Sequence, residues 1–369
     1  MIDSVFIDNA YAAMERGFPK FRKRKKKMAK RSVIKNLWSI LFIRPEKNNE
    51  NFFLLYPKPE IERIFSNIQQ LNFNHSSFLK RSLFFLQLGY ISSNSKIRVW
   101  AAKKGYRYLQ QYFVSDNITI LNCGPSILSP FLAKLCEDKN DESKFYIIQH
   151  GLYQIDYMPY RFEFASKACI SIIWSNLLAK HYLSLGMDAK NIMVLPTYLF
   201  SQIKKLNTSK KVLIIGESIN KINSNFDREY QDKVTNVISY LKANTHYSEF
   251  KFKKHPRALP SPELDKALEE NQIESISEIK LNDFGLVIGA VSTLMIEALA
   301  EGCRVLQLAM DEFEISVGDY SLYTSIAYLE DMKNIKEKID ILNNINNNFI
   351  KSEFLRVEDN YEFHYKLLL

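Results

Sequence analysis

Two groups of polar residues in the second half of the chain have the types and spacing expected of a phosphate site. His255 and Arg257 follow the alternating run 250–254, and both side chains donate hydrogen bonds suited to a phosphate, Arg257 in a bidentate manner. Ser292 and Thr293 stand at the start of a helix pattern. The turn before this helix is expected to leave its first backbone N–H groups free for an anion. The two groups together predict one phosphate site.

Three further residues are expected to border this site. Glu297 comes one helical turn after Thr293 on the same face, where it either accepts from a ribose hydroxyl or is a surface charge. Gly216 and Glu217 follow the apolar run 212–215 and open its turn. The residues predicted to form or border this phosphate site are His255, Pro256, Arg257, Ser292, Thr293, Glu297, Gly216 and Glu217.

The first half of the chain offers candidates for a general base. His150 follows the apolar run 145–148 and precedes a glycine, so its ring is expected to project from the carboxyl end of a strand. Histidine titrates near neutrality and can remove a proton from an attacking hydroxyl. The alternative is a neutral histidine satisfied by backbone groups. Asp156 and Glu163, in the polar and aromatic loop that follows, are equally acceptable bases.

A strand–turn–helix–strand pattern over residues 286–308 positions the phosphate group. An apolar run at 286–288 precedes the turn, the helix covers 293–301, Gly302 ends it, and a second run covers 303–308. Residues 118–136 repeat the unit, which is typical of a parallel α/β sheet. The other strands are expected at residues 5–7, 52–57, 145–148, 168–174, 191–196, 212–216 and 250–254, and the other helices at 61–71, 78–88, 97–112, 127–136, 176–185 and 233–243.

The chain has 369 residues, which indicates two domains. A polar stretch at 201–211 is interpreted as the linker between an N-terminal Rossmann-like domain (1–200) and a C-terminal one (210–330). Residues 331–369 are expected to be rich in helix, with a loop at 343–348 where asparagine is frequent.

Composition excludes several classes of protein. The four cysteines have no metal-like spacing and are interpreted as reduced thiols of a cytosolic protein. There is no HExxH or DxD pattern, so no tightly bound metal or other cofactor is expected. The absence of GxxxxGK[ST] and of a strand-linked GxGxxG disfavours P-loop NTPases and dinucleotide enzymes. No apolar run is long enough to span a membrane, and no signal peptide is expected.

The positive charge is concentrated near the N-terminus. Nine basic residues and no acidic one lie in Lys20–Arg31, as many as the net charge of +9. This localisation argues against nucleic acid as a partner. An apolar segment with a tryptophan follows at 33–43, so the segment 20–43 predicts attachment to an anionic membrane surface. The alternative is a solvated basic loop followed by a core helix.

The motifs together resemble those of a known class of enzymes. The chain has His-Gly after a strand in its first half, then His-Pro, and finally Ser-Thr at the start of a helix that ends Glu-Ala-Leu. This pattern, over residues 147–308, resembles the GT-B glycosyltransferases of bacterial surface polysaccharide synthesis. The groups most similar in pattern are bacterial sialyl- and polysialyltransferases, capsular Kdo transferases and teichoic-acid-type glycerophosphotransferases.

The resemblance implies two Rossmann-like domains facing across a cleft and assigns roles within them. His255, Ser292 and Thr293 would bind the phosphate of a cytidine nucleotide, and His150 would be the base, as in the glycerophosphotransferases. The sialyltransferases take their base from an acidic pair followed by glycine. Here Glu137-Asp138 is followed by Lys139, so that motif is missing.

The function implied is a metal-independent glycosyltransferase. It would work at the inner face of the cytoplasmic membrane as a peripheral protein. It would move a sugar from a nucleotide-activated donor onto a glycan or lipid-linked acceptor of a capsule, lipooligosaccharide or O-antigen. The alternatives are a CDP-polyol phosphotransferase, a GT-B nucleotide-sugar 2-epimerase, and a non-catalytic membrane-associated assembly protein.

Overall fold

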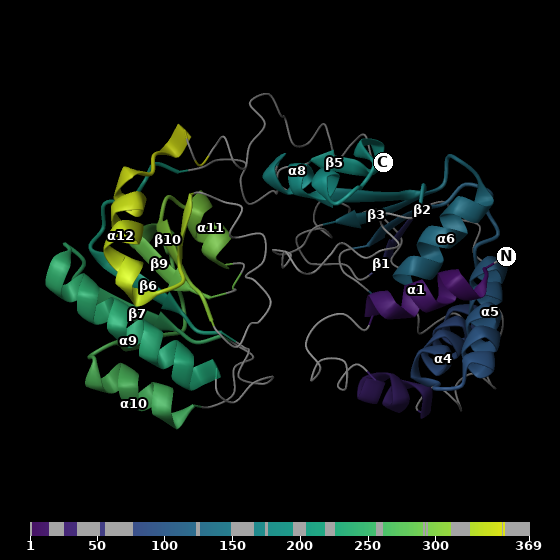
Figure 1. Ribbon diagram of the computed structural model, residues 1–369, viewed down its shortest axis with the longest axis horizontal. Coiled ribbons are helices and arrows are strands. Elements are labelled where there is room, and N and C mark those ends of the chain that lie inside the picture. The colour runs from purple at the N-terminus through teal and green to yellow at the C-terminus, as the bar shows by residue number, and fades with distance from the viewer. Residues whose placement is uncertain are drawn as a thin grey trace. The chain divides into compact units, whose positions relative to one another are not determined.

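The chain forms two compact units, each built on a parallel β-sheet (Figure 1). Unit 1 comprises residues 1–150, 157–173 and 179–194, and unit 2 comprises 151–156, 174–178 and 195–369. The computed structural model describes residues 2–14, 26–34, 52–55, 77–122, 126–148, 166–173, 176–194, 204–217, 226–255, 261–290, 292, 294–310, 325–348 and 350.

The described strands of unit 1 form one sheet in which every neighbouring pair is parallel. Their order in the sheet follows their order in the chain: β1 (Phe52–Leu55), β2 (Thr119–Asn122), β3 (Lys144–Ile148), β4 (Cys169–Ile173) and β5 (Ile192–Val194). Residues opposite one another on one face, such as Ile120, Phe145 and Cys169, are buried in the unit's core. The strands predicted in this half at residues 52–57, 118–122, 145–148, 168–174 and 191–196 are therefore confirmed within the described residues, and positions 56–57, 174 and 195–196 lie outside them.

Most helices of unit 1 come before β2 and β3 in the chain. They are α1 (Ser4–Met14), α4 (Ser77–Ile91), α5 (Ser95–Tyr112) and α6 (Ser129–Lys139), with α8 (Asn176–Ser184) and the short η1 (Ala189–Asn191) later in the chain. The predicted strand at residues 5–7 is wrong, because this segment is helical. Asp3 Oδ1 accepts a hydrogen bond from Phe6 N at 2.7 Å, and the helical spacing of Ile7, Ala10 and Tyr11 buries one face. The helix predicted at 61–71 lies outside the described residues.

Six described strands form the sheet of unit 2, again all parallel. They are β6 (Lys211–Ile215), β7 (Glu249–Lys253), β8 (Glu274–Ile276), β9 (Leu286–Gly289), β10 (Arg304–Leu308) and β11 (Ile326–Leu329). Their order across the sheet is β11-β10-β9-β6-β7-β8. The chain thus starts in the middle at β6, runs out to β8, returns to β9 beside β6, and runs out to β11. This is the Rossmann strand order.

Helices cover both faces of this sheet (Figure 1). The helices are α9 (Phe226–Asn244), α10 (Pro262–Glu270), α11 (Leu294–Ala300) and α12 (Ile335–Asn344), with short turns η4 (Leu281–Asp283) and η6 (Met332–Asn334). Figure 1 shows α9 and α10 together on one side of the strands and α11 on the other. Strands β6, β9 and β10 are accordingly buried on both faces, as their continuous apolar runs predicted. The predicted α/β class, with two units of parallel sheet, is confirmed.

Two segments expected to be irregular belong to unit 2 and are fixed by hydrogen bonds within it. Within the predicted linker, Lys204 N donates to Ala300 O at 2.9 Å and Asn207 N donates to Gly302 O at 2.8 Å. The predicted loop at 343–348 is partly wrong, since Asn343 and Asn344 end α12 and residues 347–348 are helical. The amide of Asn347 accepts from Leu206 N and donates to Lys204 O, so this side chain joins the end of the chain's described part to the segment before β6.

Candidate functional site

The candidate site lies where the sheet of unit 2 changes direction. Strands β6 and β9 are neighbours, but the chain leaves them toward opposite edges of the sheet. In open α/β sheets, ligands bind outside the carboxyl ends of the strands at this switch point. Gly216 and Glu217 follow β6 directly, and Ala290 and Ser292 follow β9. The fold therefore brings together two of the segments that the sequence had singled out separately.

Glu217 joins the two strand ends. Its side-chain oxygen Oε1 accepts hydrogen bonds from Ala290 N at 3.1 Å and from Ser292 N at 3.0 Å. The residue is only 8% exposed, so these bonds are largely shielded from water. A carboxylate from the turn after β6 thus fixes the backbone of the turn after β9.

This arrangement corrects one prediction. The turn before α11 was expected to leave its N–H groups free for an anion, but Glu217 accepts from those of Ala290 and Ser292. Two more backbone N–H groups are bonded within the turn. Leu294 N donates to Ser292 Oγ at 3.3 Å, and Met295 N donates to Ser292 O at 3.1 Å. Ser292 therefore caps the helix as predicted. None of these four N–H groups is left for a ligand.

We call the Glu217 carboxylate, together with its two N–H donors at Ala290 and Ser292, the clamp. Two buried side chains that were not predicted from the sequence support it. The hydroxyl of Tyr230, on α9, donates to Ile215 O at 2.5 Å, at the end of β6. Burial, and then the negative charge of Glu217, raise the pKa of Tyr230, so its hydroxyl stays protonated as a donor. Gln307 Nε2, on β10, donates to Ala290 O at 2.6 Å. A glutamine within the apolar run 303–308 was the sequence signal for this contact.

The neighbouring strand β7 brings His255 to the same edge of the sheet. Gly216 N donates to Lys253 O at 2.8 Å. A Cβ atom on Gly216 would lie 2.7 Å from Phe252 Cζ and 3.2 Å from His255 N, so only glycine fits between the two strand ends. His255 is half-buried at this point.

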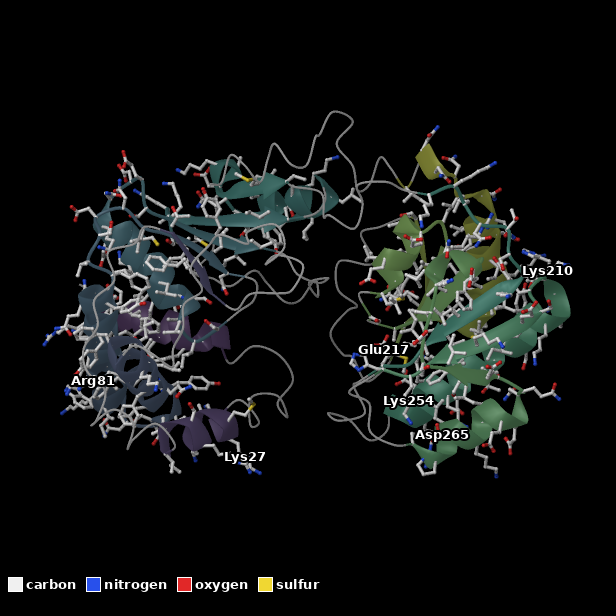
Figure 2. All side chains as sticks on the ribbon, turned by 180° about the vertical axis from the view of Figure 1, so that it is seen from behind. Lys27, Arg81, Lys210, Glu217, Lys254 and Asp265 are labelled. Carbon is white, nitrogen blue, oxygen red and sulfur yellow. The ribbon has the colours of Figure 1, made fainter. Side chains whose placement is uncertain are left out.

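Lys254, next to His255, belongs to a different contact. Its ammonium group lies 3.8 Å from Asp265 Oδ1 on α10, and Figure 2 shows the two side chains close together. Because successive side chains alternate along an extended chain, Lys254 is expected to point away from its neighbour His255. Its pairing with α10 gives it a partner outside the clamp.

The predicted site residues fall into two sets. Gly216, Glu217, His255 and Ser292 lie at the carboxyl edge formed by β6, β7 and β9, and Glu297 is half-buried in the first turn of α11. The predicted residues that lie outside the described part of the chain are His150, Asp156, Glu163, Pro256, Arg257 and Thr293. Their predicted roles stay predictions.

A second polar cluster, also missed from the sequence, lies at the carboxyl end of β2 in unit 1. Asn122 Nδ2 donates to Ser129 Oγ at 2.9 Å, and Ser126 N donates to the same oxygen at 3.0 Å. All three residues are buried. The cluster connects the end of the strand to the first turn of α6, so it stabilises the turn between them.

Neither a metal-binding cluster nor a membrane-spanning helix occurs among the described residues. No group of three or more His, Cys, Asp or Glu side chains in these residues is arranged to hold a metal ion. No helix within the same ranges is both long and apolar enough to cross a membrane.

The sequence matches no protein-family model and no curated protein. Similar solved structures include the UDP-GlcNAc 2-epimerase from Methanocaldococcus jannaschii, at 13% identity, TM-score 0.48, and coverage of 86% of this chain and 98% of that one. HepE from Anabaena, solved with UDP, has 11% identity, TM-score 0.46, and coverage of 86% and 99%. A variant of the wall teichoic acid polymerase TagF has 10% identity, TM-score 0.42, and coverage of 100% and 98%. At these identities the resemblance concerns the fold alone.

Proposed function

We propose that the chain is a glycosyltransferase that moves a sugar from a nucleotide-activated donor, a cytidine nucleotide, onto a bacterial capsule, lipooligosaccharide or O-antigen glycan. The observation that carries the proposal is the switch point of unit 2, where Glu217 joins the ends of β6 and β9 beside His255. A buried polar clamp at the carboxyl edge of a Rossmann sheet, where ligands bind, is the arrangement expected of a nucleotide site.

The clamp limits which groups of the chain are left to bind the donor phosphate. Because Glu217 already takes the N–H groups of Ala290 and Ser292, the donor phosphate would be bound mainly by side chains. We assign this role to His255 and, among the residues outside the described ranges, to Arg257 and Thr293. These groups would stabilise the charge that develops on the leaving nucleotide.

The first test is thermal unfolding of the full chain with CMP, CDP, UDP and GDP in turn. UDP belongs in the panel because HepE was solved with it. A ligand at about 100 times its Kd stabilises the native state by about 2.7 kcal/mol. We expect this increase with a cytidine nucleotide and its loss in His255→Ala.

His246→Ala is the matched control for this measurement. His246 is exposed and precedes β7, at the opposite end of the strand that carries His255, so its removal should leave the nucleotide effect intact. A shift with UDP alone would point to a hexosyltransferase or the 2-epimerase. No shift with any nucleotide would support the assembly-protein alternative.

The chemical step is assigned to the first half of the chain. We propose His150 as the general base, with Asp156 and Glu163 as the competing candidates, and no tightly bound metal. His150→Ala should abolish sugar transfer while keeping the thermal shift with nucleotide. Sugar transfer that survives in His150→Ala would contradict the assignment of the base. Loss of sugar transfer on addition of EDTA would contradict the proposed absence of a metal.

We also propose that Lys20–Arg31 attaches the protein to an anionic membrane surface on the cytoplasmic side. The structure describes residues 26–31 of this segment, which lie in a helix that continues to residue 34. Lys27, Lys30 and Arg31 are exposed, while Ala29 is buried in the core of unit 1. Because Ala29 is part of the core, charge reversal tests the proposal better than deletion. Lys27→Glu/Lys30→Glu/Arg31→Glu should weaken binding to anionic vesicles.

A further inference from the structure

Helix α5 carries a basic face that takes no part in the candidate nucleotide site. Lys96, Trp100, Lys103, Lys104 and Arg107 recur at intervals of three and four residues, which places them along one side of the helix. On its other side, α5 buries Ala102, Tyr106 and Leu109 in the core of unit 1. The core therefore fixes which side of α5 meets the surroundings.

Two large apolar side chains lie on the same outward face. Trp100 is 51% exposed and Ile97 is 45% exposed. Trp100 is held in place by Phe85 of α4, whose ring packs against it edge to face at a centroid distance of 5.5 Å. Lys104 Nζ lies 4.7 Å from the Phe85 ring centroid and 5.2 Å from that of Trp100. The exposed tryptophan is thus supported from within and placed among cations.

The charge around this face is of one sign. Residues 26–34 and 77–112 contain eleven basic residues and no acidic one. Arg98, on the edge of α5 nearer α1, pairs with Asp8 at 3.2 Å. Lys96, Lys103 and Arg107 form no ion pair with any part of the chain that the structure describes. Figure 2 shows Arg81 of α4 and Lys27 pointing outward from unit 1.

We propose that the outward face of α5 (Lys96, Ile97, Trp100, Lys103, Lys104 and Arg107) docks on an anionic lipid surface. The cations would contact acidic headgroups, and Trp100 with Ile97 would enter the interface between headgroups and acyl chains. A nucleic acid is disfavoured, because Lys104 already lies over the Trp100 ring and an aliphatic Ile97 adds nothing to base stacking. The proposal holds whatever reaction the chain catalyses, since it involves none of the nucleotide-site residues.

The decisive experiment is co-sedimentation of the full chain with vesicles. These consist of phosphatidylcholine alone or of phosphatidylcholine mixed with phosphatidylserine. Lys103→Glu/Arg107→Glu should lower the partition coefficient on the anionic vesicles at least tenfold. The control, Lys280→Glu/Lys336→Glu, makes the same change in net charge at exposed positions of unit 2 and should bind as the unaltered chain does. Equal loss in both pairs would overturn the proposal, because net charge alone would then explain binding.

Fluorescence separates this face from the segment at 20–43. The chain has three tryptophans, so Trp38→Phe/Trp174→Phe leaves Trp100 as the only one. Anionic vesicles should shift its emission to the blue, and brominated lipid should quench it. Vesicle binding with an unchanged emission spectrum would show that residues other than Trp100 contact the membrane, and would overturn the proposal. Binding to RNA, with no binding to vesicles, would replace the lipid by a nucleic acid and overturn the proposal.

Discussion

At the scale of single residues, the candidate site depends most on Glu217. Glu217→Ala should lower the free energy of unfolding by about 1–3 kcal/mol, because it leaves the N–H groups of Ala290 and Ser292 without their acceptor in a buried turn. Glu217→Gln keeps an acceptor oxygen of the same shape and should be close to the unaltered chain. Urea unfolding of the two variants measures the difference.

Glu278→Ala is the control for this comparison. Glu278 is exposed in the loop after β8, and its removal should change stability by less than about 0.5 kcal/mol. If Glu217→Ala unfolds at the same urea concentration as this control, the two hydrogen bonds do not hold the turn. A nucleotide Kd measured for Glu217→Ala then tells whether the turn's position matters for binding, separately from stability.

At the scale of elements, the contact of α4 with α5 rests on a glycine. A Cβ on Gly105 would lie 2.8 Å from Leu86 Cγ and 3.0 Å from Ser82 O, closer than real contacts allow. Gly105→Ala should therefore push the two helices apart at a cost of about 1–3 kcal/mol, and the gain of about 1 kcal/mol in helix propensity leaves a net destabilisation of unit 1 of up to about 2 kcal/mol. Thermal unfolding followed by far-UV circular dichroism measures this loss.

Gln111→Ala provides the matched comparison in the same helix. Gln111 is exposed, so alanine there should be neutral or slightly stabilising. If Gly105→Ala and Gln111→Ala unfold at the same temperature, α4 and α5 can move apart without loss of stability, and their close contact is not essential. The α5 face proposed to meet lipid would then tolerate movement of the helix.

The elements that the sequence predicted well are those with strong local signals. Strands such as β6 and β9 are continuous apolar runs that end at glycine, and Gly302, at φ +87°, ends α11 as expected. The helix α1 was misassigned because Val5, Phe6 and Ile7 look like a strand when taken alone. The strand β8 was missed because its three residues are mostly exposed at the sheet edge and carry no apolar run.

At the scale of the whole molecule, the sequence could not reveal the order of the strands. Glu217 was predicted to border the site, but its bonds to Ala290 and Ser292 exist only because β6 lies beside β9. No local pattern indicates that pairing between strands far apart in the chain. The sequence therefore predicted that Glu217 and Ser292 lie near one another, but not that the Glu217 carboxylate fixes the turn after β9.

Buried acidic groups in both units make the whole chain sensitive to alkali. Burial raises the pKa of Cys303 from 9.0 to about 12. Burial also raises the pKa of Cys136 and Tyr11, and burial and then the Asp138 carboxylate raise that of Tyr106. In the folded state these groups stay protonated and neutral at pH values where the unfolded chain loses their protons.

The change of stability with pH follows from the number of protons that the folded and unfolded states bind. Above about pH 9 the unfolded state binds fewer protons than the native state, so stability falls as pH rises, by up to about 1.4 kcal/mol per pH unit for each such group. Below that pH these groups leave stability unchanged. The urea midpoint should therefore be lower at about pH 10 than at about pH 8, and Cys303→Ala should reduce the difference. Equal midpoints at the two pH values would show that these groups are hydrated in the native protein.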